Sequence, residues 1–223
     1  MSVTSSNKKL HLLPAFKNNV GDSQWVYRKL LKAMSEPGTI LRLFENNNTS
    51  SLYIDEFTSP YLYSTTWSIA QSLLDGDCTT HLSKSLAQVG FMQSLRFYTD
   101  AHISQTTPPA QFAFMNINEF STDDSFDRLF STGTLIAPHE SCTLIIQVPH
   151  ISIKPQLYVT GPGIKTQKQF SIEGISQQAI EFIQANNQLY PCGVDMVFCS
   201  ATHIVALPRT TALSSSTTIS EVA

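Results

Sequence analysis

Arg209 stands out as a side chain that can hold an anion. It comes soon after the apolar run 203–207, and two hydroxyl-bearing residues, Thr210 and Thr211, follow it. A guanidinium binds a phosphate or carboxylate through two parallel hydrogen bonds, and threonine hydroxyls can complete such a shell. The sequence therefore predicts that this strand end holds a ligand or contacts another subunit, unless the arginine is satisfied within its own fold.

Asp195 offers Arg209 a partner of that kind. The two apolar runs that flank Ala201 and Thr202 are typical of a hairpin with a two-residue loop. This register places Asp195 opposite Pro208, one step from the arginine. A structural ion pair and a ligand contact are both open interpretations at this point.

A glycine-rich turn follows another apolar run. Gly161, Pro162 and Gly163 come directly after a predicted strand and lead to Lys165. Backbone N–H groups in such a turn can face an anion, to which the lysine adds positive charge. The spacing is not that of a P-loop, because no Gly-Lys-Ser/Thr follows. A plain type II turn, with proline fixing φ and glycine taking a positive φ, is the interpretation we favour.

Ser131 and Thr132 begin a third polar group, which continues through Gly133 to Thr134. Clustered hydroxyls of this kind can contact a phosphate. Turns and helix caps use the same residue types, so a structural role is the favoured interpretation and phosphate contact is the alternative.

Metal and covalent chemistry find little support in the sequence. The four cysteines contain no C-x-x-C pair, and no two of the six histidines share a helix face at metal-binding spacing. No G-x-S-x-G nucleophile elbow is present, and no lysine stands in a context that marks a Schiff base. We therefore predict no metal, no cofactor and no catalytic residue.

Composition narrows the classes of partner. The 223 residues carry a net charge of −3, so there is no basic excess to neutralise nucleic acid. No stretch approaches the ~20 apolar residues of a membrane span, and no signal peptide is recognised. We expect a soluble cytoplasmic protein. Only 14% of residues are charged, which favours either extensive contacts with other proteins or a general preference for neutral polar residues.

Alternating helices and short strands must position these groups. Apolar residues at helical spacing predict helices, and short apolar runs bounded by turn residues predict strands. The first helix is expected to begin at Asp22 or Ser23 and to end before Pro37. The further helices are expected at 64–74, 85–97, 123–130 and 175–183, and the strands at 39–44, 81–82, 111–117, 142–148, 157–160, 194–199 and 203–207.

This alternation favours a single α/β domain of three layers. The sheet is expected to be mixed, because the terminal hairpin needs an antiparallel pair. We expect a flexible N-terminus at 1–15, the folded domain at 16–211, and a disordered Ser/Thr-rich tail at 212–223.

Several stretches together resemble one family, PhnH. Each is weak alone, but they occur in the right order across roughly residues 16–211. The N-terminus before this core and the tail after it are additions to the family pattern. The matching stretches are Arg28–Gly38, Gln93–Phe97 with Thr99, Ser131–Thr134 with Pro138 and Thr143–Val148, Leu157 with Thr160–Ile164, and Pro191 and Gly193–Asp195 with Ala206–Thr211.

The resemblance implies an α/β fold similar to that of pyridoxal-phosphate-dependent transferases, without the cofactor lysine. It implies a place in the two-fold symmetric core complex of carbon–phosphorus lyase, with PhnG, PhnI and PhnJ as partners and a homodimer of this chain. That complex is associated with forming a ribose 1-phosphonate 5-triphosphate from a nucleoside triphosphate and a phosphonate. The resemblance assigns cleavage of the carbon–phosphorus bond to PhnJ. It implies no catalytic residue in this chain.

Two functional hypotheses follow. The first is an accessory subunit, needed by the complex but without turnover of its own. The second is a subunit that binds phosphonate or triphosphate directly through Arg209, Thr210 and the Gly161–Gly163 turn. A pyridoxal-phosphate enzyme is a third idea that rests on fold alone, and fold does not imply function.

Overall fold

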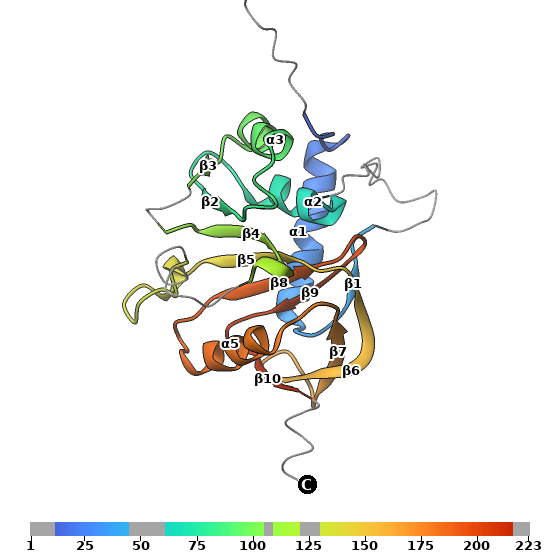
Figure 1. The fold of residues 1–223 in the computed structure, drawn as a ribbon, viewed down its shortest axis with the longest axis vertical. Coiled ribbons are helices and arrows are strands. Elements are labelled where there is room, and N and C mark those ends of the chain that lie inside the picture. The colour runs from blue at the N-terminus through green and yellow to red at the C-terminus, as the bar shows by residue number, and fades with distance from the viewer. Residues whose placement is uncertain (1–11, 45–60, 105–108, 121–129, 216–223) are drawn as a thin grey trace, which may run out of the picture.

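A computed structural model describes residues 12–44, 61–104, 109–120 and 130–215. Their main feature is a seven-stranded mixed sheet (Figure 1). Five neighbouring strands run parallel, and the hairpin partner β9 and the edge strand β1 complete the sheet in antiparallel pairings. In spatial order the strands are β1 (Leu41–Arg42), β9 (His203–Leu207), β8 (Asp195–Cys199), β5 (Thr143–Gln147), β4 (Phe112–Asn116), β2 (Thr79–Leu82) and β3 (His102–Ile103).

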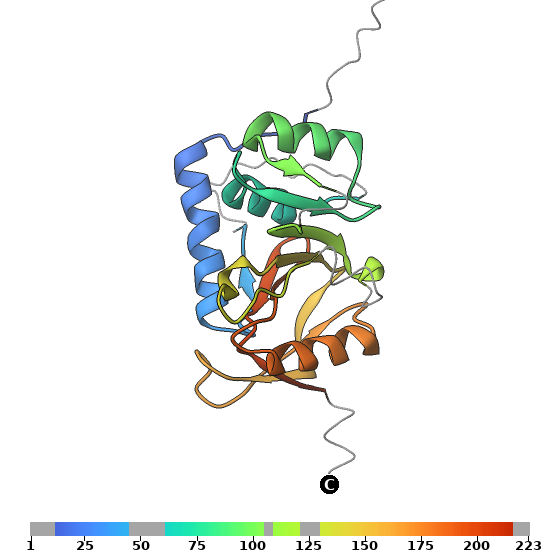
Figure 2. The same ribbon diagram turned by 90° about the vertical axis from the view of Figure 1, so that its left-hand side faces the viewer.

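Both faces of this sheet are covered. Helices α1 (Asn19–Ser35), α2 (Ser64–Leu73) and α3 (Val89–Thr99) pack on one face. Helix α5 (Gln177–Gln188) and a three-stranded antiparallel sheet pack on the other, with strands in the order β10 (Ala212–Ser215), β6 (Ile151–Thr160) and β7 (Lys168–Ile172). Figures 1 and 2 show α3 and α5 at opposite ends of the long axis. The predicted α/β class and mixed sheet are confirmed.

Strand β5 shows why its sequence is apolar throughout. Leu144 and Ile146 belong to the core shared with α5 and the small sheet, whereas Ile145 between them belongs to the core shared with α1, α2 and α3. Successive side chains of a strand point to opposite faces, so a strand covered on both sides needs apolar residues at every position.

Helix α1 begins one turn earlier than predicted. Its cap is Asn18, whose side chain accepts from the Gly21 N–H over 3.0 Å. Asp22, expected as the cap, is instead buried within the first turn, and its carboxylate accepts from the Asn18 N–H over 3.0 Å. Two side chains thus satisfy N–H groups at the helix start. The predicted end before Pro37 is confirmed.

The small sheet was largely missed from sequence. Strand β7 was not predicted, and the predicted strand 157–160 is only the last part of the ten-residue β6. The prediction of a disordered tail from residue 212 is wrong for 212–215, which form β10 and pair with β6. Disorder was predicted from composition alone. Composition does not show that the edge of β6 is free to pair with this segment. The rest of the tail, and the predicted helix at 123–130 apart from its last residue, lie outside the described residues.

The predicted terminal hairpin is confirmed in detail. Met196 pairs with Leu207 and Cys199 with Ile204, which leaves Ala201 and Thr202 as the loop. The other predicted helices and strands of the described residues are present, with ends that shift by a few residues.

Strand order reverses within the parallel part of the sheet. Strand β2 pairs with both β3 and β4, so the chain leaves β2 for one side and returns to the other. In open α/β sheets, ligands bind outside the carboxyl ends of the strands at such a reversal.

Candidate functional site

Arg209 is paired with Asp195, as one of the two sequence interpretations predicted. The Arg209 backbone N–H donates to Asp195 Oδ1 over 2.8 Å, and Nη2 lies 2.6 Å from Oδ2. The two side chains are 16% and 18% exposed, so solvent screens the pair only in part. The structural ion pair is therefore present.

The remaining donors of Arg209 serve two loops. Nη1 donates to the carbonyl oxygens of Pro138, over 2.7 Å, and Pro191, over 3.4 Å. Nη2 also donates to Ser141 Oγ over 2.5 Å. Nε donates to Asp195 Oδ1 over 3.3 Å, so each nitrogen of the guanidinium has a partner inside the fold. Binding of a ligand by this residue stays a prediction, and it would require exchange of these bonds.

Ser131 and Thr132 belong to the same region but act mainly through their backbones. The Ser131 carbonyl accepts from the Cys142 N–H, and the Thr132 carbonyl accepts from the Gly193 N–H, each over 2.7 Å. The Ser131 hydroxyl accepts from the Gly133 N–H over 3.0 Å, which is a turn bond. This loop is therefore tied to the loop that carries Pro191.

The glycine turn packs against the chain that follows Arg209. A Cβ on Gly161 would lie 2.9 Å from the Thr210 carbonyl oxygen, and one on Gly163 would overlap the Ser35 carbonyl oxygen at the end of α1. Thr211 donates its N–H to Pro208 O over 2.8 Å, and its buried Oγ1 has no hydrogen-bond partner among the residues that the structure describes. These residues therefore join the ends of three elements.

This whole group lies at the amino edge of the parallel strands. Arg209 follows β9, but β9 runs antiparallel to β8, so the end of β9 lies beside the start of β8 at Asp195. The ligand hypothesis for Arg209 rests on its place at a strand end, and α/β folds do bind ligands at strand ends. That rule applies to the carboxyl ends of parallel strands, which lie at the opposite edge.

A crevice of about 340 Å³ opens at the carboxyl edge. It lies beyond the ends of β4 and β5, beside the reversal of strand order between β2 and β4. Its polar lining comes from the loop after β2, the end of β4 with the short helix η1 (Ile117–Glu119), the end of β5 and the start of α2. The polar side chains in the lining are those of Tyr63, Ser85, Asn116, Asn118, Glu119 and Gln147.

Glu119 is held in place by the loop after β2. Its carboxylate accepts from the Ser83 hydroxyl over 2.5 Å, from the Ser85 N–H over 2.9 Å and from the Ser85 hydroxyl. Burial raises the pKa of this carboxyl, but the hydrogen bonds from Ser83 and Ser85 together outweigh it, so the pKa lies below its ordinary value. Glu119 is therefore an anion and a hydrogen-bond acceptor at neutral pH.

Gln147 and Asn116 continue this network along the floor. Gln147, only 2% exposed, donates to Asn116 Oδ1 over 2.8 Å and accepts from the Tyr63 N–H over 2.8 Å. Asn116 in turn donates to the Ser85 hydroxyl. The network joins residues more than thirty positions apart, and a fully paired network of this kind holds its side chains rigidly.

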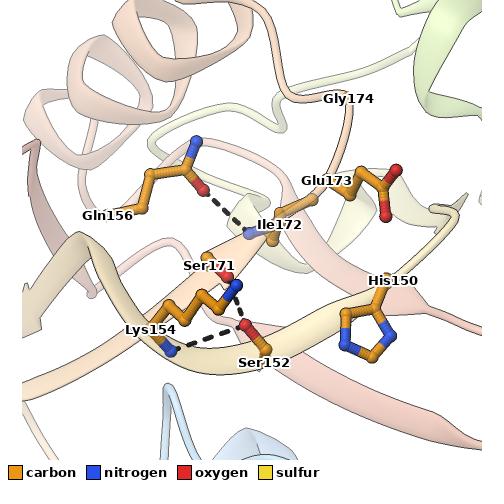
Figure 3. Close-up of a pocket in the computed structure, with 8 residues that line it drawn as sticks. All are labelled: His150, Ser152, Lys154, Gln156, Ser171, Ile172, Glu173 and Gly174. Carbon is orange, nitrogen blue, oxygen red and sulfur yellow. Dashed lines mark hydrogen bonds between the residues drawn. The ribbon is translucent and has the colours of Figure 1, made fainter.

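A second pocket, of about 290 Å³, lies on β6 and β7 (Figure 3). The Ser152 and Ser171 hydroxyls are 2.6 Å apart in its wall, and Gln156 reaches across to the Ile172 N–H over 3.0 Å. Strand pairing is interrupted between Ser152 and Leu157, because Pro155 lies there and cannot donate to a ladder.

The two pockets are neighbours. Gly174 lines the second, and a Cβ built on it would lie 3.3 Å from Ile117 Cγ2 and 3.8 Å from Pro149 Cδ, both in the lining of the first. Their charge differs. Lys154, His150 and Glu173 line the second pocket, whereas no Lys, Arg or His of the described residues lines the first.

Comparison with protein-family models shows which family the chain belongs to. The model described as bacterial phosphonate metabolism protein (PhnH) matches residues 14–214. The chain belongs to the PhnH family. A PhnH relative from Rhizobium meliloti (strain 1021), named alpha-D-ribose 1-methylphosphonate 5-triphosphate synthase subunit PhnH, is 29% identical and covers 89% of this chain and 94% of its own. A protein of Stutzerimonas stutzeri, named putative C-P lyase subunit protein HtxG, is 25% identical and covers 84% of each chain.

The stretches that pointed to PhnH gather around the Arg209 pair, except for the one in α3. The end of α1 contacts the glycine turn, the glycine turn contacts the chain after Arg209, and Arg209 contacts the loop that follows Ser131. The carboxyl-edge crevice was missed, because its residues form no short motif. The available signal was an amide side chain at the end of each of two apolar strands, Asn116 and Gln147.

Three further findings limit the chemistry that the described part of this PhnH chain supports. Within the described ranges, no helix is both long and apolar enough to cross a bilayer. In the same ranges no three His, Cys, Asp or Glu side chains gather as a metal site would require. Burial raises the pKa of the Cys142 and Cys199 thiols, which makes them poor nucleophiles at neutral pH.

Proposed function

We propose that this chain is an accessory subunit of a carbon–phosphorus lyase core complex, required for phosphonate breakdown but without turnover of its own. The observation that carries the proposal is the family match over residues 14–214, together with the near-complete overlap with a relative named as a synthase subunit. In this role the chain would support formation of a ribose 1-phosphonate 5-triphosphate by its partners.

The amino edge of the sheet supports a role in contacts between subunits. Leu135 and Ile136 are 79% and 96% exposed, and Leu189 and Tyr190 are also exposed. Arg209 holds the loops that carry these four residues, through its bonds to Pro138 and Pro191 on the same loops. Exposed apolar side chains on fixed loops do not stabilise a soluble monomer. In a subunit interface the same side chains become buried against a partner.

We propose PhnG-, PhnI- and PhnJ-type subunits as the partners, with two copies of this chain in a symmetric cytoplasmic assembly. Arg209, Thr210 and Thr211 then act by shaping the surface. Direct contact of these residues with phosphonate or triphosphate is the alternative, and it is less well supported because the guanidinium donors are already engaged.

Co-purification tests the proposal. The chain is tagged, coexpressed with the three other subunits, and the mass of the purified assembly is measured. We expect all four subunits in fixed ratio. The double variant Leu135→Ser, Ile136→Ser should release partners or dissociate the two copies while the chain stays folded. Val20→Ser on exposed α1 is the matched control. Recovery of the unaltered chain without partners would refute the subunit role.

A further inference from the structure

The crevice at the reversal of strand order has the chemistry of a site for hydroxyl groups. Its polar lining consists of one carboxylate, amides and hydroxyls. A phosphoryl group needs cations or clustered N–H donors, which this lining does not provide, and Glu119 would repel it. Neutral hydroxyls donate to carboxylate and amide oxygens and accept from amide N–H groups, so they match the lining.

The position of the carboxylate supports the same ligand class. In the dinucleotide-binding Rossmann fold, whose ligand lies at the reversal of strand order, an acidic side chain hydrogen-bonds a ribose hydroxyl. Glu119 stands at the end of η1, directly after β4, which flanks the reversal. Ser83 and Ser85 fix its orientation from the end of β2, the strand on the other side of the reversal.

Asn118 adds a polar group at the mouth of the crevice. It is exposed, it lines the crevice, and within the described residues its side chain makes no hydrogen bond. Asn116 and Gln147, by contrast, are bonded to one another and form the rigid floor. A ligand would therefore meet a fixed carboxylate and an amide that is available to it.

We propose that this crevice binds the hydroxyl groups of a sugar, with Glu119 and Asn118 as the residues that contact them. The pocket chemistry leads to a hydroxylated ligand. The choice of a ribosyl group among such ligands rests on the proposed function, in which a ribose derivative is the product of the assembly. The site is distinct from the Arg209 region, which lies at the opposite edge of the sheet.

Binding to the isolated full-length chain tests the inference. Adenosine is the neutral ribosyl probe, and inorganic triphosphate and methylphosphonate are the anionic probes, each titrated by calorimetry. We expect adenosine to bind, and Glu119→Gln and Asn118→Ala each to weaken that binding by about tenfold, as loss of a hydrogen bond to a ligand does. Lys154→Ala, in the neighbouring pocket, is the matched control and should leave adenosine binding unchanged.

Three outcomes would overturn the inference. These are no binding of adenosine, binding that is unaffected by both crevice variants, and binding of the anionic probes alone with loss in Lys154→Ala. Asn118→Ala keeps the test valid if Glu119→Gln disturbs the fold, because the Asn118 side chain makes no hydrogen bond to the described residues that the change would remove. Since co-purification tests the subunit role separately, a chain that assembles but binds no adenosine refutes the sugar site alone.

Discussion

Asp195 and Arg209 are joined twice across one hairpin, through the Arg209 backbone N–H to Oδ1 over 2.8 Å and through Nη2 to Oδ2 over 2.6 Å. Backbone and side chain of the same residue thus share one carboxylate. The first bond fixes the end of the hairpin, and the second aims the guanidinium at the loops of Pro138 and Pro191. Strand register and loop position are therefore coupled.

Arg209→Ala should destabilise the chain. It leaves the Asp195 side chain without its cation and the Pro138 carbonyl without its donor, which should cost about 3 kcal/mol in the free energy of unfolding. Urea denaturation at constant m-value measures this loss. Arg209→Lys should recover only part of it, because an ammonium lacks the planar fork.

Arg96→Ala, at an exposed position of α3, is the control for Arg209→Ala and should change stability by less than about 0.5 kcal/mol. If Arg209→Ala leaves stability unchanged yet abolishes growth on a phosphonate, direct ligand contact is the better explanation of Arg209.

Gly163→Ala should destabilise the chain although it removes no side chain. Gly163 has φ +81°, and an added Cβ would overlap the Ser35 carbonyl oxygen. Backbone strain alone costs about 1–2 kcal/mol, and the overlap adds to it. The loss should appear as a lowered Tm. Gly76→Ala, whose Cβ would meet nothing nearer than 3.6 Å, should leave Tm nearly unchanged. Equal effects of the two changes would argue against the close approach of the turn to α1.

Asn186→Ala should lower the free energy of unfolding, because it removes a buried amide that pairs with the backbone. Asn186 is 2% exposed, accepts from the Val194 N–H over 2.8 Å and donates to the Val194 carbonyl over 2.9 Å. Alanine leaves both backbone groups buried and unpaired, at a cost of about 2–4 kcal/mol in unfolding free energy. Gln188→Ala, exposed on the same helix, should cost less than about 0.5 kcal/mol. A small effect at both positions would mean that water replaces the amide.

Glu119→Gln should lower stability only where the carboxylate is ionised. The pKa of folded Glu119 lies below its ordinary value of 4.5. The ionised form therefore stabilises the fold fully above that value, and the contribution disappears as the pH falls through the lowered pKa. The difference in unfolding free energy between the variant and the parent chain should be present at neutral pH and shrink at strongly acidic pH. Glu140→Gln, at an exposed position, is the control and should change the unfolding free energy by less than about 0.5 kcal/mol at neutral pH. A difference that is independent of pH would refute the assignment to charge.

Local signals predicted the parts of the fold that local interactions determine. The hairpin register follows from its two-residue loop, and it correctly placed Asp195 opposite Pro208. The start of α1 was misplaced because Asn18 and Asp22 are both good caps, and the choice between them depends on which turn is buried. Strand β10 was missed because only a tertiary partner, the edge of β6, orders a Ser/Thr-rich segment.

The carboxyl-edge crevice could not be predicted because it depends on strand order. Ser85, Asn116 and Gln147 come together only when β4 lies between β2 and β5. Strand direction also decides at which edge of the sheet the Arg209 region lies. A strand end with an arginine suggested a ligand site, but the antiparallel pairing placed that end at the other edge. Residue types indicated which groups could bind a ligand. The edge of the sheet on which those groups lie depends on strand order and direction, which short sequence segments do not specify.

The large sheet ends on each side in a strand of only two residues, β1 and β3. Such short edges offer few unpaired N–H and C=O groups to an incoming strand from another chain. Strand addition at the described edges of this sheet is therefore a weak route to association, and it is also a weak route to edge-to-edge aggregation. Contacts with other subunits are expected to depend on side-chain packing, so point substitutions of apolar residues should be able to separate assembly from folding.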